Sequence, residues 1–194
     1  MMGNKIMFWI LASVGIAIAL ELLYRAFLFI FARPRILKWV GSWFTKFTIH
    51  APDRSDYLTR YYILKNNWMP FRIYLHQFHR SDGDRDCHCH PFDFLSVILY
   101  SGYCETRPGY RDRNYYQGDI LFRRGPDLHS VALFPECLGK EREAWTLVFT
   151  SKKYREWGFM TENGWMHHRE YFDIKFGKGN WSDADDPMLQ ITKE

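Results

Sequence analysis

The sequence has few acidic residues in its most apolar part, the N-terminal segment. Its first 50 residues contain one acidic side chain, Glu21, and six basic ones, although the whole chain of 194 residues carries a formal charge of only +4. The remaining residues are therefore close to neutral, which argues against a nucleic-acid-binding surface. A basic excess within an apolar segment is instead typical of a chain that meets an anionic membrane surface.

Internal repeats and low-complexity tracts are also missing, which excludes collagen-like, coiled-coil and solenoid architectures. The four cysteines do not have the spacing of a small disulfide scaffold, and they fit a reducing compartment. Aromatic side chains, in contrast, make up 19% of the residues. Because large, stiff rings suit sheets and walled pockets, the composition favours a globular β domain with an appendage.

The first apolar segment is long enough to cross a bilayer. Ile6–Leu23 is almost entirely apolar, and about 20 such residues are needed for a span. Glu21 can pair with Arg25 one turn later. We expect a retained transmembrane anchor over residues 1–32; the alternative is a cleaved signal peptide with a small-x-small site ending at Ala19. Since five of the six basic residues follow the span, the positive-inside rule predicts a single-pass protein with a cytoplasmic C-terminal domain.

A second helix is predicted after Pro34, a residue that suits a first helical turn. Ile36, Trp43 and Phe47 recur on one face at helical spacing, opposite basic and polar residues. Such an amphipathic helix either lies in the membrane interface or packs on the protein's own body. We assign residues 33–56 to this helix and its linker.

The pattern changes after residue 56 to short aromatic and β-branched runs separated by turn residues. This pattern predicts an all-β barrel or sandwich over residues 57–177, followed by a polar tail over 178–194. The expected strands are Arg60–Leu64, Phe71–Phe78, Phe94–Ser101, Ile120–Arg123, Leu128–Phe134 and Ala144–Thr150.

The strongest chemical signal is the run from Cys87 to His90. On a strand, residues two apart face the same side, so His88 and His90 can share a metal ion. His129, on a later strand, is the third candidate ligand. Cys87 and Cys89 then point to the other face, which argues against a zinc site built from all four side chains. We expect both cysteines to be small side chains buried on that face.

The spacing of these histidines resembles the cupin superfamily. Its first motif contains a His-x-His pair, an acidic slot and a Gly seven positions after that slot, and its second runs from a Gly to a His eleven positions later. This chain matches the two motifs at His88, His90, Gly102, Gly118 and His129. The resemblance implies a double-stranded β-helix, or jelly-roll, barrel.

Segments 74–78, 88–94 and 145–149 also resemble small uncharacterised bacterial and phage cupin proteins, which brings no known reaction. The chain departs from the superfamily at the acidic slot, which falls on Leu95, a residue that cannot bind metal. Three histidines alone resemble the iron site of thiol dioxygenases, although the cysteine of their Cys–Tyr crosslink also has Leu95 in its place. Asp93 could supply the missing carboxylate, or could instead orient a histidine N–H.

The resemblance implies a divalent metal at the three histidines, Fe(II) first, with Zn, Mn or Ni as alternatives. His76 either lines the pocket or is a hydrogen-bonded sheet residue, and arginines nearby could bind an anionic substrate. The residues expected to contact a substrate are Arg72, His76, Tyr103, Arg107 and Trp145.

Three functions remain open at this point. The first is a membrane-anchored non-haem Fe(II) oxygenase that acts on a small or membrane-associated substrate. The second is a noncatalytic cupin module that binds a ligand or partner at the membrane, and the third is a Zn or Mn hydrolase or isomerase. The anchor implies the lipid bilayer as a partner, and recruitment to a membrane protein explains it equally well. Since one fold hosts all three functions, fold alone does not choose between them.

Overall fold

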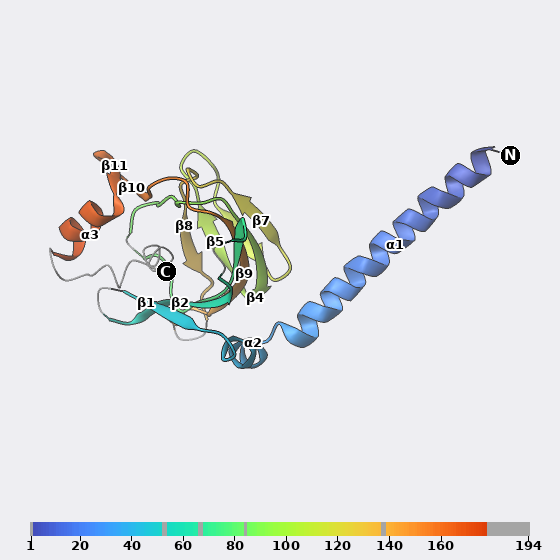
Figure 1. The fold of residues 1–194 in the computed structure, drawn as a ribbon, viewed down its shortest axis with the longest axis horizontal. Coiled ribbons are helices and arrows are strands. Elements are labelled where there is room, and N and C mark those ends of the chain that lie inside the picture. The colour runs from blue at the N-terminus through green and yellow to red at the C-terminus, as the bar shows by residue number, and fades with distance from the viewer. Residues whose placement is uncertain (1, 52–53, 66–67, 84, 137–138, 178–194) are drawn as a thin grey trace.

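The computed structural model describes residues 2–51, 54–65, 68–83, 85–136 and 139–177. A long helix, α1 (Met2–Phe31), stands away from a body rich in strands (Figure 1). The helix α2 (Pro34–Gly41) follows directly, and α3 (His168–Phe176) lies on the side of the body away from α1. The strands are β1 (Lys46–His50), β2 (Asp56–Leu64), β3 (Phe71–Phe78), β4 (Phe94–Tyr100), β5 (Gly102–Thr106), β6 (Arg113–Tyr116), β7 (Ile120–Arg123), β8 (Ser130–Leu133), β9 (Ala144–Ser151), β10 (Gly158–Thr161) and β11 (Gly164–His167).

Two antiparallel sheets enclose the main core. The larger has the order β1-β2-β3-β9-β4-β7 and the smaller β6-β5-β8, while β10 and β11 form a separate hairpin. Buried side chains of the larger sheet, such as Tyr74 and Ile98, belong to one cluster with Tyr103 and Val131 of the smaller sheet. The prediction of an all-β body is therefore confirmed.

The predicted helix beyond Gly41 is wrong. The helix ends at Gly41, which packs so closely on Tyr61 that an added Cβ would lie only 2.9 Å from the ring. The chain turns over residues 42–45, and Phe47 lies in β1, where it pairs with Arg60 of β2. The first strand of the larger sheet thus begins at residue 46, within the segment assigned to the helix and its linker. The polar tail predicted at 178–194 lies outside the described residues.

The interpretation that the second helix packs on the protein's own body holds for one of its faces. Leu37 and Gly41 of α2 are buried against the body. Trp39 is 58% exposed, and Trp43 just after the helix is 63% exposed. The helix therefore packs on the body with one face and presents indole rings to its surroundings with another.

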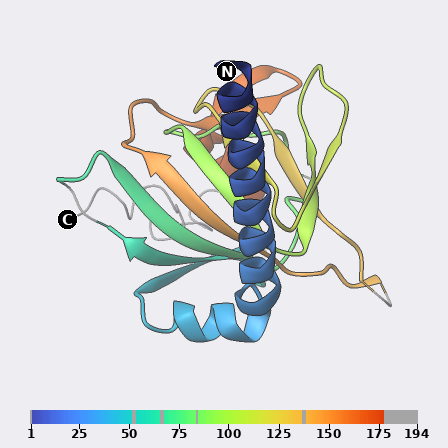
Figure 2. The same ribbon diagram turned by 90° about the vertical axis from the view of Figure 1, so that its right-hand side faces the viewer.

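The end of α1 packs on the outer face of the larger sheet. The Tyr24 hydroxyl donates a hydrogen bond to the Gly118 carbonyl (3.1 Å), and Leu28 is 4% exposed. Leu28 and Ala32 share a second buried cluster with Leu75 and Trp145 of that sheet. The last turns of α1 are therefore part of the folded body, and Figure 2 shows the helix rising in front of the strands.

The rest of α1 is exposed and apolar. Its window Trp9–Ile30 has a mean hydropathy of 1.9, which makes it a candidate membrane span by length and composition. The expected Glu21–Arg25 ion pair is present, with Arg25 Nε 2.6 Å from Glu21 Oε1.

Candidate metal centre

An extended segment carries the first two histidines into the interior. The His88 N–H donates to the His129 carbonyl (2.8 Å) and the His129 N–H donates back to the His88 carbonyl (2.9 Å). The next residue, Cys89, donates its N–H to Gly158 and is 1% exposed. The segment is held by isolated bridges rather than within a regular strand, but it has the predicted alternation, with His88 and His90 toward the cavity and Cys89 away from it.

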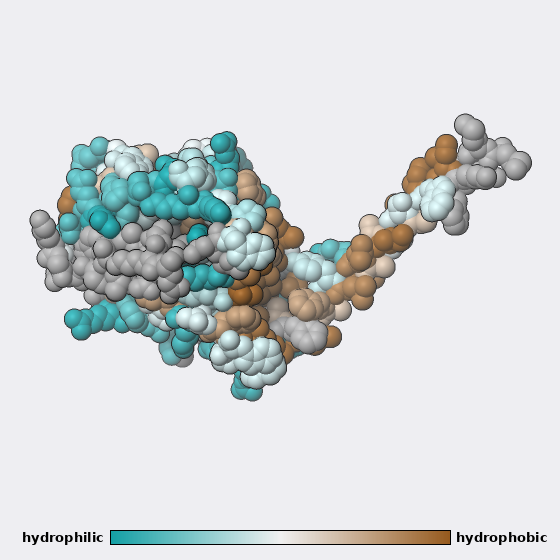
Figure 3. Space-filling model, in the orientation of Figure 1, coloured by the Kyte–Doolittle hydropathy of each residue, from teal (hydrophilic) through white to brown (hydrophobic). Residues whose placement is uncertain are grey.

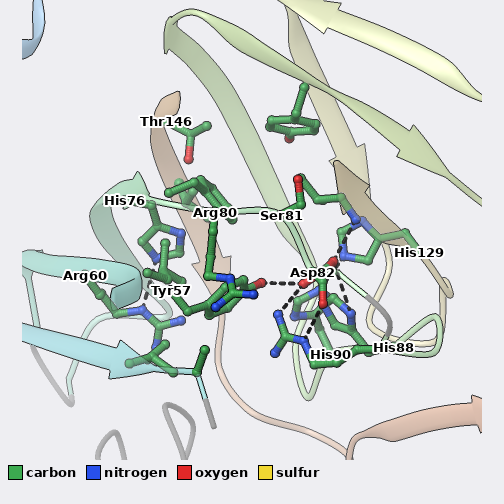
Figure 4. Close-up of a pocket in the computed structure, with 18 of the residues that line it drawn as sticks. Tyr57, Arg60, His76, Arg80, Ser81, Asp82, His88, His90, His129 and Thr146 are labelled. Atoms are coloured by element: carbon green, nitrogen blue, oxygen red, sulfur yellow. Dashed lines mark hydrogen bonds and ion pairs between the residues drawn. The ribbon is translucent and has the colours of Figure 1, made fainter. Parts of the chain in front are cut away.

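The three predicted histidines converge on one point. One ring nitrogen from each of His88, His90 and His129 lies within 4.8 Å of the others. The Nε2 atoms of His90 and His129 are 2.8 Å apart, so one of them carries a proton that a bound metal ion would replace. Figure 4 shows the three rings meeting at one wall of the cavity. Three imidazoles at this spacing suit a divalent transition metal.

Burial keeps two of these rings neutral. It lowers the pKa of His88 and of His90 well below the ordinary value, and the neighbouring His129 lowers both further. Neutral imidazole is the form that binds metal, since the ligand nitrogen needs a free lone pair. His88 and His90 are therefore in the metal-binding form at neutral pH.

The sequence reasoning missed Glu105, which fixes the orientation of His129. The carboxylate lies 2.8 Å from Nδ1 of His129, so that Nδ1–H donates to it and leaves Nε2 free for metal. Arg123 pairs with both Glu105 oxygens and donates to the Tyr115 hydroxyl (2.7 Å). Burial alone would raise the pKa of Glu105, but hydrogen bonds from His129 and Arg123 lower it to about 2.

A second buried carboxylate, Asp82, stands behind His88. Its Oδ1 accepts hydrogen bonds from the Tyr57 hydroxyl (2.5 Å) and Arg85 (2.6 Å), and its Oδ2 accepts one from the Val131 N–H (2.7 Å). His88 Nδ1 is 3.8 Å from Oδ2. The sequence reasoning missed Asp82 as well, because its partners Tyr57 and Val131 lie on two distant segments.

Asp93 is not with the histidines. Its Oδ1 accepts hydrogen bonds from the Tyr154 hydroxyl (2.5 Å) and the Gly125 N–H (2.7 Å), which together lower its pKa. It therefore holds the turn before His129 and orients no histidine N–H. Leu95 faces outward, and Phe94 takes the inward position, with its ring centroid 4.9 Å from that of His90.

The cavity beside the histidines has a volume of about 800 Å³. Of the predicted substrate contacts, it is lined by His76 and Tyr103 but not by Arg72, Arg107 or Trp145. Trp145 points to the outer side of the sheet, where it stacks on Tyr61. The sequence suggested the opposite side, because the face of β9 with the large apolar side chains is the outer one and the face with Thr146 and Val148 lines the cavity.

Two of these residues have other partners. The Arg107 guanidinium lies 4.7 Å from the Tyr110 ring centroid and 3.6 Å from Asp127. His76 accepts a hydrogen bond from Arg60 Nε (3.0 Å), and both side chains are buried. His76 is thus both a cavity residue and a hydrogen-bonded sheet residue.

A second group of metal-ligating side chains includes His167 and His168. His168 is 3% exposed and stacks on Trp157 with ring centroids 4.5 Å apart. Together with Glu156 the two rings offer ligand atoms within 4.8 Å of one another. However, His167 Nδ1 accepts the N–H of Arg169 as a helix cap, which in neutral imidazole leaves Nε2 protonated.

No protein-family model and no curated protein matches the sequence. Among solved structures, a cupin-2 domain protein from Rhodospirillum rubrum is similar at a TM-score of 0.49 and 11% identity, over 62% of this chain and 78% of that one. A cupin 2 conserved barrel domain protein from Rhodopseudomonas palustris gives 0.48 and 10%, over 62% and 80%. A structure titled Fe(II) HppE gives 0.44 and 10%, over 55% and 56%. The solved structures that this chain is similar to are thus of the cupin type, the same family that the sequence motifs resemble. They assign no activity to this chain.

Proposed function

We propose that this chain is a membrane-anchored, metal-dependent oxygenase whose cofactor is Fe(II). The observation that carries the proposal is a cluster of three histidines, two of them held neutral, at the wall of a cavity of about 800 Å³. His88, His90 and His129 would hold the metal, and bound Fe(II) supplies redox chemistry with open positions for O₂ and substrate. Phe94 packs beside this site, with its ring centroid 4.9 Å from that of His90.

The protein's own residues have separate tasks in this proposal. Glu105 fixes the ring of His129, and Asp82 holds the segment that contains His88. The aromatic wall of the cavity, with Phe92 and Phe159, excludes water from the reacting groups. Arg60 and His76 lie across the cavity from the metal centre (Figure 4).

The cavity lining favours an anionic substrate. The described residues that line the cavity include four arginines but one carboxylate, so the lining carries an excess of positive charge. They are Arg54, Arg60, Arg80, Arg85 and Asp82. In a binding screen by thermal shift, small carboxylates should raise Tm more than their amides. Arg60→Gln should remove this difference, and equal shifts in the wild type would contradict an anion site.

The metal content of anaerobically purified protein tests the main proposal. We expect stoichiometric Fe in the wild type, loss of the metal in His90→Ala and retention in Asp93→Asn. Zn or Mn with no O₂ consumption would favour a hydrolase or isomerase. Protein that binds none of Fe, Zn, Mn or Ni would overturn the enzyme proposal in favour of a noncatalytic binding module.

We further propose that α1 is a retained membrane span with the body in the cytoplasm. Its exposed apolar window, the Glu21–Arg25 pair and the basic residues that follow support this arrangement. The intact chain should stay in the membrane pellet after carbonate washing. A soluble chain that begins at Leu20 would instead show that the segment is a cleaved signal peptide.

A further inference from the structure

We propose that the outer face of β4 and β7 rests in the membrane interface, so that the lipid bilayer covers it. This inference depends on the proposed anchor and adds the part of the body that meets lipid. The surface, here called the outer patch, consists of Leu95 on β4 together with Ile120 and Phe122 on β7. These residues are 36%, 59% and 56% exposed.

Strand alternation places the outer patch on one face. Leu95 and Phe122 are directly paired across the two strands, and Ile120 is paired with Val97. Val97 and Leu99, on the same face of β4, belong to the cluster beneath the end of α1. The outer patch therefore continues an apolar surface that α1 already covers in part. Figure 3 shows hydrophobic residues gathered on the side of the body next to this helix.

The contact with α1 sets the depth of the outer patch. Tyr24 bonds to Gly118, two residues before β7 begins, and Leu28 is buried against the body. Both helix residues lie inside the apolar window that ends at Ile30. Tyr24 lies six residues before Ile30, which is about 9 Å along a helix. When the membrane span ends at Ile30, Tyr24 and the start of β7 beside it therefore lie about 9 Å inside the apolar layer. Amphipathic surfaces seated in a membrane interface are buried by about 5–10 Å.

Basic and aromatic side chains near the end of α1 also suit a position in the membrane interface. Arg33, Arg35 and Lys38 are exposed there and suit lipid phosphate groups. Trp39 in α2 and Trp43 just after it expose their indole rings, and such rings favour the interface. A second copy could instead pair with the open edge of β7, but the depth set by α1 favours lipid as the occupant.

Photo-crosslinking of the full chain in lipid nanodiscs tests the proposal. Phe122 is replaced by p-benzoylphenylalanine in nanodiscs of phosphatidylcholine and phosphatidylglycerol. The matched control carries the same group in place of Ile174 on α3, which is 68% exposed and lies on the far side of the body (Figure 1). We expect lipid adducts at position 122 and only the unirradiated background at 174. A second probe in place of Leu95 should give the same result as position 122.

The possible failures are distinguishable. If the chain is not recovered with the nanodiscs, the anchor itself fails. If it is recovered but position 122 gives no more lipid adduct than 174, the anchor stands and the outer patch proposal is overturned. Crosslinked dimers at position 122 in place of lipid adducts would also overturn it and identify a second copy as the occupant.

Discussion

Glu105 lies 24 residues before His129 in the chain, yet its carboxylate accepts a hydrogen bond from the His129 ring. The same carboxylate compensates the buried Arg123 guanidinium. A residue with these two partners determines which nitrogen of His129 faces the cavity. Carboxylates in this position commonly matter for metal affinity although they do not touch the metal.

We expect Glu105→Gln to weaken metal binding by about 10–100-fold, because an amide holds the His129 tautomer less firmly. Competition with a chromogenic chelator measures the change. Asp93→Asn is the matched control, since Asp93 bonds to Gly125 and Tyr154 rather than to a histidine. An equal loss in both variants would contradict the role assigned to Glu105.

Burial beside Arg60 makes His76 a source of pH-dependent stability. Burial, and to a lesser degree the Arg60 charge, lower the pKa of His76 well below its ordinary value of 6.5. Below pH 6.5 the His76 imidazole therefore binds a proton in the unfolded chain but not in the folded chain. The free energy of unfolding falls as the pH drops through this range, down to the folded pKa.

Urea unfolding of the metal-free chain in detergent measures this effect. Between pH 7.5 and 5.5 the wild type should lose about 1.4 kcal/mol more stability than His76→Gln, which has no proton to bind. His88 and His90 contribute equally to both proteins and cancel in the comparison. Parallel pH dependence of the two proteins would show that His76 does not resist protonation.

At the scale of elements, the junction of β4 and β5 has a strict glycine requirement. A Cβ on Gly102 would lie 2.0 Å from the Tyr115 carbonyl oxygen, and the backbone φ there is +155°. This approach lets β5 pair with β6 and carry Glu105 inward. Gly109, at φ +79°, has open space around its Cβ position.

We therefore expect Gly102→Ala to cost at least about 3 kcal/mol of stability, since a backbone atom must move. Gly109→Ala should cost only about 1–2 kcal/mol from its positive φ. Urea unfolding midpoints compare the two. Similar losses would mean that the Gly102 contact relaxes without cost.

Local periodicity explains which parts of the molecule could be predicted. The period of two located β3 and β7 to the residue and placed His88 and His90 on one side of their segment. Glu105 and Asp82 could not be found in this way, because their partners come from distant segments. The helical spacing likewise continues to Phe47, although the helix ends at Gly41 and Phe47 pairs with Arg60 in the sheet.

At the scale of the whole molecule, the larger sheet separates two environments. The cluster formed with α1 and α2 lies on its outer face, and none of that cluster's buried residues lines the cavity. Among the described lining residues, the exposed side chains are His50 and Arg54, at the connection between β1 and β2. A substrate would thus enter from the aqueous side rather than from the lipid.

Truncation tests how much of α1 belongs to the body. Removal of residues 1–23 should leave a folded chain that still binds metal. Removal of residues 1–32 should cost about 2–5 kcal/mol, because it strips Leu28 and Ala32 from a buried cluster. Thermal unfolding compares the two chains, and equal Tm values would contradict a structural role for the end of α1.

Adjacent residues of β7 serve opposite sides of the molecule. Phe122 faces outward in the outer patch, whereas Arg123 faces inward and pairs with Glu105, which holds His129. A slip of β7 against β4 by a single residue would exchange the two sides, carrying a guanidinium outward and a phenyl ring toward the carboxylate. The register of one four-residue edge strand must therefore satisfy the outer patch and the metal centre together, so neither can be redesigned alone.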